Sequence, residues 1–147
     1  MHIFSRAVIA AAVVSTSAAC SSPTDNVPVI AFWMARTPNT DTAGRLGFHF
    51  AVTNPSADAV FFSTCNGRIR PDITVAASGQ APYVVNEAYC VGGLVSLNPL
   101  DAGATVSGEG SIARVAGARY TPSIAYLIAQ RFDAPGRRVT SADFRAP

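Results

Sequence analysis

The three cysteines are the residues of this sequence with the most definite chemistry. They are Cys20, Cys65 and Cys90. A thiol can be acylated, can join a second thiol in a disulfide, or can bind zinc as a thiolate. Disulfides persist only outside the reducing cytosol, so the choice depends on where the chain folds. The residues before Cys20 bear directly on this choice, because they can direct export.

The first 19 residues have the three parts of a secretory signal peptide. Arg6 supplies a short positive region, Ala7–Val14 is apolar, and Ser17–Ala19 offers small residues for cleavage. The apolar stretch is shorter than the roughly 20 residues that span a bilayer, and no later segment is long enough either. We therefore predict export of the chain, with residues 1–19 as signal peptide.

Ser17-Ala18-Ala19-Cys20 resembles a bacterial lipobox, in which a cysteine follows the cleavage site directly. The resemblance implies acylation of Cys20, which would attach the mature chain to a bacterial cell membrane. Residues 20–27 are polar and would form a flexible tether. Ser17 stands where the pattern usually has leucine, so an ordinary secretory cut at the same bond stays open. The protein would then be secreted or periplasmic.

Cys65 and Cys90 remain as a pair in an exported chain, which predicts a disulfide between them. Such a bond would contribute roughly 3 to 4 kcal/mol by the loop-entropy argument. A structural zinc site usually needs four Cys or His ligands, and the mature chain adds only His49. A redox pair would more often be a C-x-x-C motif, which is absent.

Charge excludes one class of function. The chain has 147 residues, and all 11 of its basic residues are arginine. They are scattered, with only Arg137 and Arg138 adjacent, whereas nucleic-acid binding normally leaves a clustered basic stripe. We expect no nucleic-acid partner.

The composition and length indicate one globular domain. Almost half of the residues are apolar, and residues 28–147 are numerous enough to form a domain with a real core.

Short apolar runs separated by turn residues indicate an all-β domain. Leu46–Thr53 alternates most clearly, with Leu46, Phe48, Phe50 and Val52 on one face. Gly108 and Gly110 indicate a bulge or a close backbone approach within the run that contains them. The expected strands are Val27–Met34, Leu46–Thr53, Ala59–Cys65, Ile69–Val75, Tyr83–Val85, Val91–Leu97, Ala104–Val115 and Arg138–Phe144. The turns expected between them include Asn54–Asp58, Asn66-Gly67 and Asn98–Gly103.

Tyr120–Phe132 fits two patterns. Thr121-Pro122 could begin a helix, and Ile124, Leu127 and Ile128 have helical spacing. Ile124, Tyr126 and Ile128 also alternate as in a strand, which the β surroundings favour. With this segment included, seven to nine strands predict an antiparallel two-sheet sandwich carrying one disulfide.

The turn and strand motifs between Leu46 and Ile112 resemble bacterial immunoglobulin-like modules. They are Phe50–Asp58, the run into Cys65, Ser78-Gly79-Gln80, and Leu97–Gly103 with its following strand. Their order is also similar to the intracellular proteinase inhibitor family of bacilli. The resemblance implies an immunoglobulin-like sandwich, with a loop-based protease inhibitor as an alternative function. The inhibitory loop would be Ser78–Pro82 or the Cys65–Cys90 segment.

No set of residues predicts catalysis, a cofactor or a metal site. His49 shares a strand face with Ala51 and Thr53, which favours a surface histidine. The acids Asp101, Glu109, Asp133 and Asp143 are isolated, and turn hydrogen bonding explains Asp41 and Asp58. Aromatic residues would belong mainly to the core: Phe32-Trp33, Phe61-Phe62, Tyr83, Tyr89 and Tyr126. We predict a non-enzymatic binding or structural module of the cell envelope, possible partners being envelope proteins, with an enzyme of unrecognised type as the remaining alternative.

Overall fold

The computed structural model describes residues 28–85 and 95–147. The predicted signal peptide, the tether with Cys20, and Cys90 lie outside these ranges, so acylation and the disulfide stay predictions. Within the described ranges, no helix is long and apolar enough to cross a membrane.

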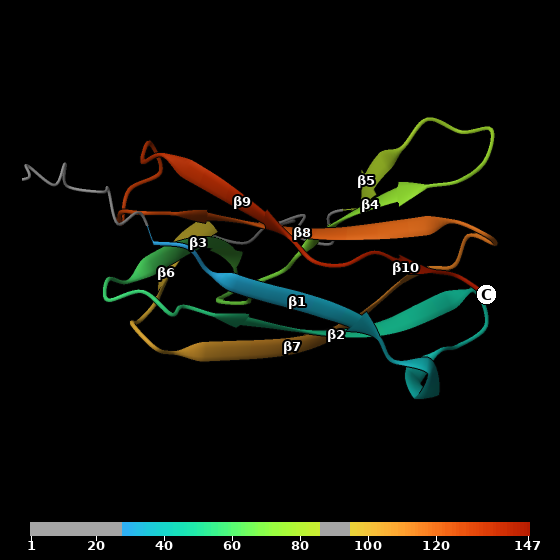
Figure 1. Ribbon diagram of the computed structural model, residues 1–147, viewed down its shortest axis with the longest axis horizontal. Coiled ribbons are helices and arrows are strands. Elements are labelled where there is room, and N and C mark those ends of the chain that lie inside the picture. The colour runs from blue at the N-terminus through green and yellow to red at the C-terminus, as the bar shows by residue number, and fades with distance from the viewer. Residues whose placement is uncertain (1–27, 86–94) are drawn as a thin grey trace, which may run out of the picture.

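The described chain is all-β, as predicted, with ten strands and one turn of 3-10 helix (Figure 1). The elements are β1 (Ala31–Arg36), η1 (Pro38–Thr40), β2 (Arg45–Thr53), β3 (Val60–Cys65), β4 (Asp72–Ala76), β5 (Tyr83–Val85), β6 (Val95–Leu100), β7 (Thr105–Ala113), β8 (Arg119–Leu127), β9 (Gly136–Thr140) and β10 (Phe144–Arg145). Two antiparallel sheets result, one with the order β1-β2-β7 and the other with β5-β4-β8-β3-β6.

The number of described strands exceeds the predicted seven to nine because the predicted strand Arg138–Phe144 is divided into β9 and β10, which pair with different parts of β8. Ser123 pairs with Asp72 of β4 on one side and with Thr140 of β9 on the other. Farther along β8, Leu127 pairs with Phe61 of β3. One side of β8 is therefore shared by β3 and β4, and the other by β9 and β10. Consequently β5 and β6 form the outer edge of this sheet, beyond β4 and β3 respectively.

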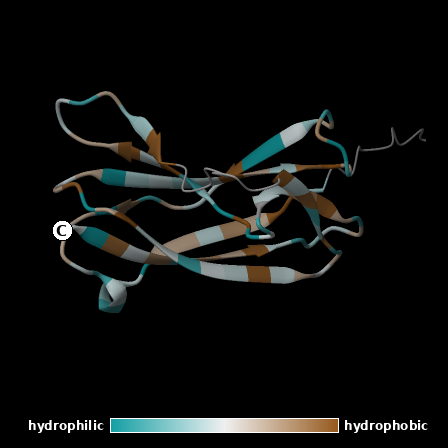
Figure 2. Cartoon of the chain, turned by 180° about the vertical axis from the view of Figure 1, so that it is seen from behind, coloured by the Kyte–Doolittle hydropathy of each residue, from teal (hydrophilic) through white to brown (hydrophobic). Residues whose placement is uncertain are grey.

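The core lies between the two sheets. The predicted inner face of β2 is confirmed, because Leu46, Phe48, Phe50 and Val52 are all buried. Hydrophobic bands cross the strands of both sheets in Figure 2. The other buried apolar side chains include Phe32, Met34, Val60, Phe62, Ile73, Val75, Leu100, Ile112, Tyr120, Ile124 and Tyr126.

The ambiguous segment is a strand up to Leu127, which confirms the strand interpretation. Tyr120, Pro122, Ile124 and Tyr126 alternate inward as buried side chains. Proline is tolerated there because Pro122 lies between the part of β8 paired with β10 and the part paired with β9. The Pro122 carbonyl accepts a bond from the Ser141 N–H at this break.

The predicted Asn98–Gly103 loop is wrong in its first half, whereas Ala102 and Gly103 do lie in a turn. Asn98–Leu100 belongs to β6 and pairs with Val60–Phe62 of β3. Pro99 suggested a loop, but β6 is an edge strand, where a missing N–H costs no ladder bond.

Candidate functional site

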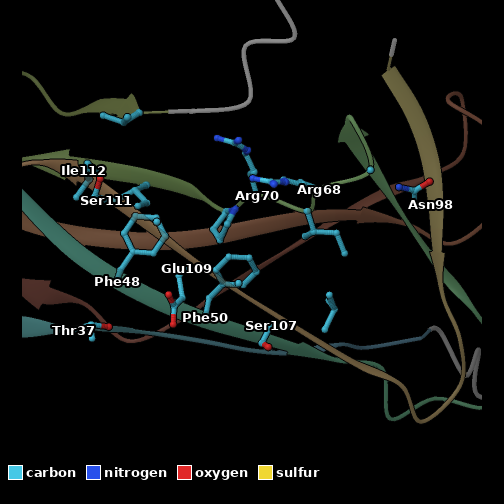
Figure 3. A pocket seen from close by; sticks show the side chains of 18 of the residues that line it. Thr37, Phe48, Phe50, Arg68, Arg70, Asn98, Ser107, Glu109, Ser111 and Ile112 are labelled. Carbon is cyan, nitrogen blue, oxygen red and sulfur yellow. The ribbon is translucent and has the colours of Figure 1, made fainter. Parts of the chain in front are cut away.

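A cavity of about 920 Å³ opens on the side of the sandwich where β6 and β7 are the edge strands (Figure 3). One wall is β7, from Val106 to Ile112, and the other is formed by Gly67–Pro71 and Asn98–Leu100. The predicted Asn66-Gly67 turn is confirmed, since both residues have positive φ values, 53° and 72°. It leads the chain from β3 into the Gly67–Pro71 wall. We call this cavity the edge groove.

Two phenyl rings form the floor of the edge groove. Phe48 and Phe50 of β2 pair with Gly110 and Gly108 of β7, on the same inner face of the sheet. A Cβ atom added at Gly110 would lie 2.4 Å from the Phe48 Cζ, and one at Gly108 would lie 2.7 Å from the Phe50 ring. The close approach predicted for these glycines is therefore confirmed: each ring occupies the space of the missing side chain.

Both strands that flank the edge groove have one unpaired edge among the described strands. β7 pairs with β2 over all nine of its residues, and β6 pairs only with β3. In an antiparallel strand, backbone groups point alternately to its two sides. The side of each strand without a strand partner thus offers N–H and C=O groups beside an apolar floor, although the Ser111 carbonyl of β7 already accepts a bond from Arg45 Nη2 at 2.7 Å.

Basic side chains border the edge groove. Arg68 and Arg70 are exposed in the Gly67–Pro71 wall, and Figure 3 shows them across the cavity from Phe48 and Phe50. Glu109 lies on β7, in register with His49, and points to the outer face of the sheet. The positive charge is therefore on one wall.

His49 lies on the outer face, where a non-catalytic surface role was predicted. Its Nδ1 is 2.7 Å from Thr37 Oγ1, and its ring meets the edge of Trp33 at a centroid distance of 4.9 Å. These contacts fix the imidazole against a threonine and an indole. In residues 28–85 and 95–147 no group of three or more His, Cys, Asp or Glu side chains could hold a metal ion.

The acidic residues are held by local contacts rather than brought together. Asp41 bonds to Arg36 and accepts the Gly47 N–H at 2.9 Å, so it joins two strands rather than closing the simple turn expected from sequence. The Arg36 hydrogen bond, followed by that of Gly47, lowers the pKa of Asp41. Asp133 and Asp143 form exposed ion pairs with Arg131 and Arg119.

Paired aromatic residues divide between the two sides of a strand, as expected. Phe32 is buried and Trp33 is 48% exposed, and in the second pair Phe62 is buried. Tyr126 belongs to the core, Tyr83 is exposed, and Tyr89 lies outside the described residues.

Residue-type patterns in the sequence did not predict the edge groove or the position of Arg68 and Arg70 beside it. The groove depends on which strands lie at the edges of the two sheets, and residue types alone do not show this.

Substitution of Gly110 by alanine should destabilise the fold by about 1–2 kcal/mol. Overpacking against the buried Phe48 ring costs typically ~1–3 kcal/mol, and the lower chain entropy of alanine returns roughly 0.5–1 kcal/mol. Urea unfolding of the variant measures the difference. Ser107→Ala, on the outward face of the same strand, is the control and should leave stability nearly unchanged. An unaltered midpoint for Gly110→Ala would contradict the tight fit.

No protein-family model matches the chain, and no curated protein matches it. The solved structures similar to it include the ApaA protein from Bordetella pertussis, with 11% identity, a TM-score of 0.49, and coverage of 81% of this chain and 91% of that one. Another is an X-ray structure from the Northeast Structural Genomics Consortium, with 10% identity, a TM-score of 0.46, and coverage of 83% and 87%.

Proposed function

We propose that this chain is a lipid-anchored, non-enzymatic binding module of the bacterial cell envelope, and that its edge groove binds an extended segment of a partner protein. In this proposal Cys20 holds the module to the membrane, and the Cys65–Cys90 disulfide stabilises it. The single observation that supports the binding role is a groove with an apolar floor, bordered by two strand edges that have no partner among the described strands.

An extended polypeptide suits this groove better than a compact ligand does. The β7 wall from Val106 to Ile112 would be about 20 Å long at ~3.3 Å per residue. A partner strand lying along it could bond to the free backbone groups while alternate side chains entered the groove over Phe48 and Phe50. Adding a strand to an exposed sheet edge is an established mode of peptide recognition.

The charge on the wall suggests the composition of the partner. Arg68 is exposed beside the apolar floor. A segment that alternates apolar and other residues, with one acidic side chain near its centre, would complement both features.

An immunoglobulin-like sandwich is the fold we propose for the module. The Tyr120 hydroxyl donates to the Ala113 carbonyl at 3.1 Å and accepts the Val115 N–H at 2.7 Å. A tyrosine that bonds back to the backbone where the chain passes between two sheets is a feature of immunoglobulin domains.

Selection from a displayed library of random peptides against the mature protein tests the binding role. We expect peptides with alternating apolar residues and an acid, whose binding protects β7 amides from hydrogen exchange. Arg68→Glu should weaken them by about ten-fold, equivalent to ~1.4 kcal/mol. Arg145→Glu, an exposed arginine on β10 outside the groove, is the matched control. Selected peptides that protect other strands and bind equally to both variants would contradict the proposal.

A further inference from the structure

The tip between β8 and β9 displays an apolar side chain in a defined turn. Phe132 is 64% exposed, the highest value among the large hydrophobic side chains of the described residues. The turn is held by bonds from the Arg131 N–H to the Ala129 carbonyl at 2.8 Å and from the Ala134 N–H to the Arg131 carbonyl at 3.1 Å. Ala134 is buried beneath it. Phe132 therefore projects from a structured tip.

The described chain begins at the same end of the molecule. The Tyr126 hydroxyl donates to the Pro28 carbonyl at 2.8 Å, which fixes the start of the domain against β8. The next residue, Val29, is 61% exposed. Figure 1 shows the first described residues and the β8–β9 tip at one end of the longest axis, with β10 and the C-terminus at the other.

The sequence before Pro28 limits how far this end can lie from an anchored Cys20. Seven residues lie between Cys20 and Pro28, so eight Cα–Cα steps join them. A chain spans at most ~3.6 Å per step, so the reach is about 29 Å even when fully extended. A lipid on Cys20 would thus keep the β8–β9 tip at a high local concentration near the bilayer surface.

We propose that Phe132 and Val29 enter the interfacial region of the bilayer to which the chain is anchored, so that the domain stands with its β8–β9 end on the membrane. This inference rests on the proposed acylation of Cys20. A weak apolar contact is sufficient here, because the anchor has already removed the cost of bringing the domain to the surface.

The charges at this end define which part makes the contact. Arg131 is exposed next to Phe132 and can reach headgroup phosphates, although it also pairs with Asp133 at 3.5 Å. Asp58 and Asp101 are exposed on the β2–β3 and β6–β7 loops of the same end. At the tip Arg131 offsets the charge of Asp133, whereas anionic lipid repels Asp58 and Asp101, so the contact is confined to the β8–β9 tip and Val29, with the two acidic loops farther from the bilayer.

Depth-dependent fluorescence quenching tests the contact in the full, processed chain. The sequence has a single tryptophan, Trp33, which Trp33→Phe removes. In that background, Phe132→Trp reports on the tip, and Val84→Trp reports on β5, where Val84 is 59% exposed. Both proteins are reconstituted into phosphatidylethanolamine–phosphatidylglycerol vesicles with brominated acyl chains, and vesicle flotation is measured in parallel.

Supporting data would be flotation of both proteins, with a blue-shifted emission and loss of most fluorescence only for the tryptophan at position 132. Flotation without quenching at position 132, or equal quenching at both positions, would overturn the contact and leave the anchor intact. Failure of both proteins to float would overturn the anchor and the contact together. Trp33→Phe alone, which lacks tryptophan, gives the background signal.

Discussion

Tyr120→Ala should lower the free energy of unfolding by about 3–5 kcal/mol, the range for removing a large buried aromatic side chain. Tyr120 is fully buried and stacks on Phe144 at a centroid distance of 5.2 Å. Its hydroxyl also holds the β7–β8 connection through Ala113 and Val115. Because whole domains are typically stable by only ~5–15 kcal/mol, this loss approaches global unfolding. Urea denaturation followed by far-ultraviolet circular dichroism measures it.

Tyr120→Phe separates the contribution of the hydroxyl to stability from that of the packed ring. It keeps the packing and leaves the Val115 N–H without its partner, so we expect a loss of about 1–3 kcal/mol. Tyr83→Ala is the exposed control and should change stability by less than ~0.5 kcal/mol. A Tyr120→Phe protein as stable as the original would show that the connection does not depend on the hydroxyl.

Asn54→Ala is the second large expected effect, a loss of about 2–4 kcal/mol, because buried backbone groups lose their partners. Asn54 is fully buried, and its Nδ2 donates to the Asp58 and Leu100 carbonyls at 2.8 and 2.9 Å. Its Oδ1 accepts the Ser56 N–H at 3.1 Å. One side chain thus joins the β2–β3 turn to the end of β6.

The matched control is Asp58→Ala. Asp58 contributes its main-chain carbonyl to this network and its side chain is exposed, so the substitution should leave the network intact. Urea midpoints of the two variants make the comparison. Equal midpoints for Asn54→Ala and the original protein would indicate that water replaces the amide. The Asn54 side chain would then not be needed to join the β2–β3 turn to β6.

Local sequence patterns predicted most of the strands and the core face. Phe48 and Phe50 alternate with smaller residues, and an apolar residue at every second position indicates a β-strand with one buried face. The same logic correctly favoured a strand around Tyr126. Asn98–Leu100 was misread because proline forbids a central strand but not an edge strand, and sequence does not reveal which strands are edges.

The edge groove could not be predicted from sequence for the same reason. Its walls come from β6, β7 and Gly67–Pro71, which meet only because β3 and β4 share one side of β8. The glycines of β7 were recognised as places of close approach, but not the rings of Phe48 and Phe50 that fill them. Acylation of Cys20 and the Cys65–Cys90 disulfide remain predictions from motif and compartment.

The placement of the two chain ends has a practical consequence. Pro28 and the C-terminus lie at opposite ends of the longest dimension of the sandwich (Figure 1). A reporter or affinity tag fused after Pro147 would therefore project away from whatever holds the leading residues. Such a fusion leaves the β8–β9 tip unobstructed and offers a handle for pulling the domain along its length.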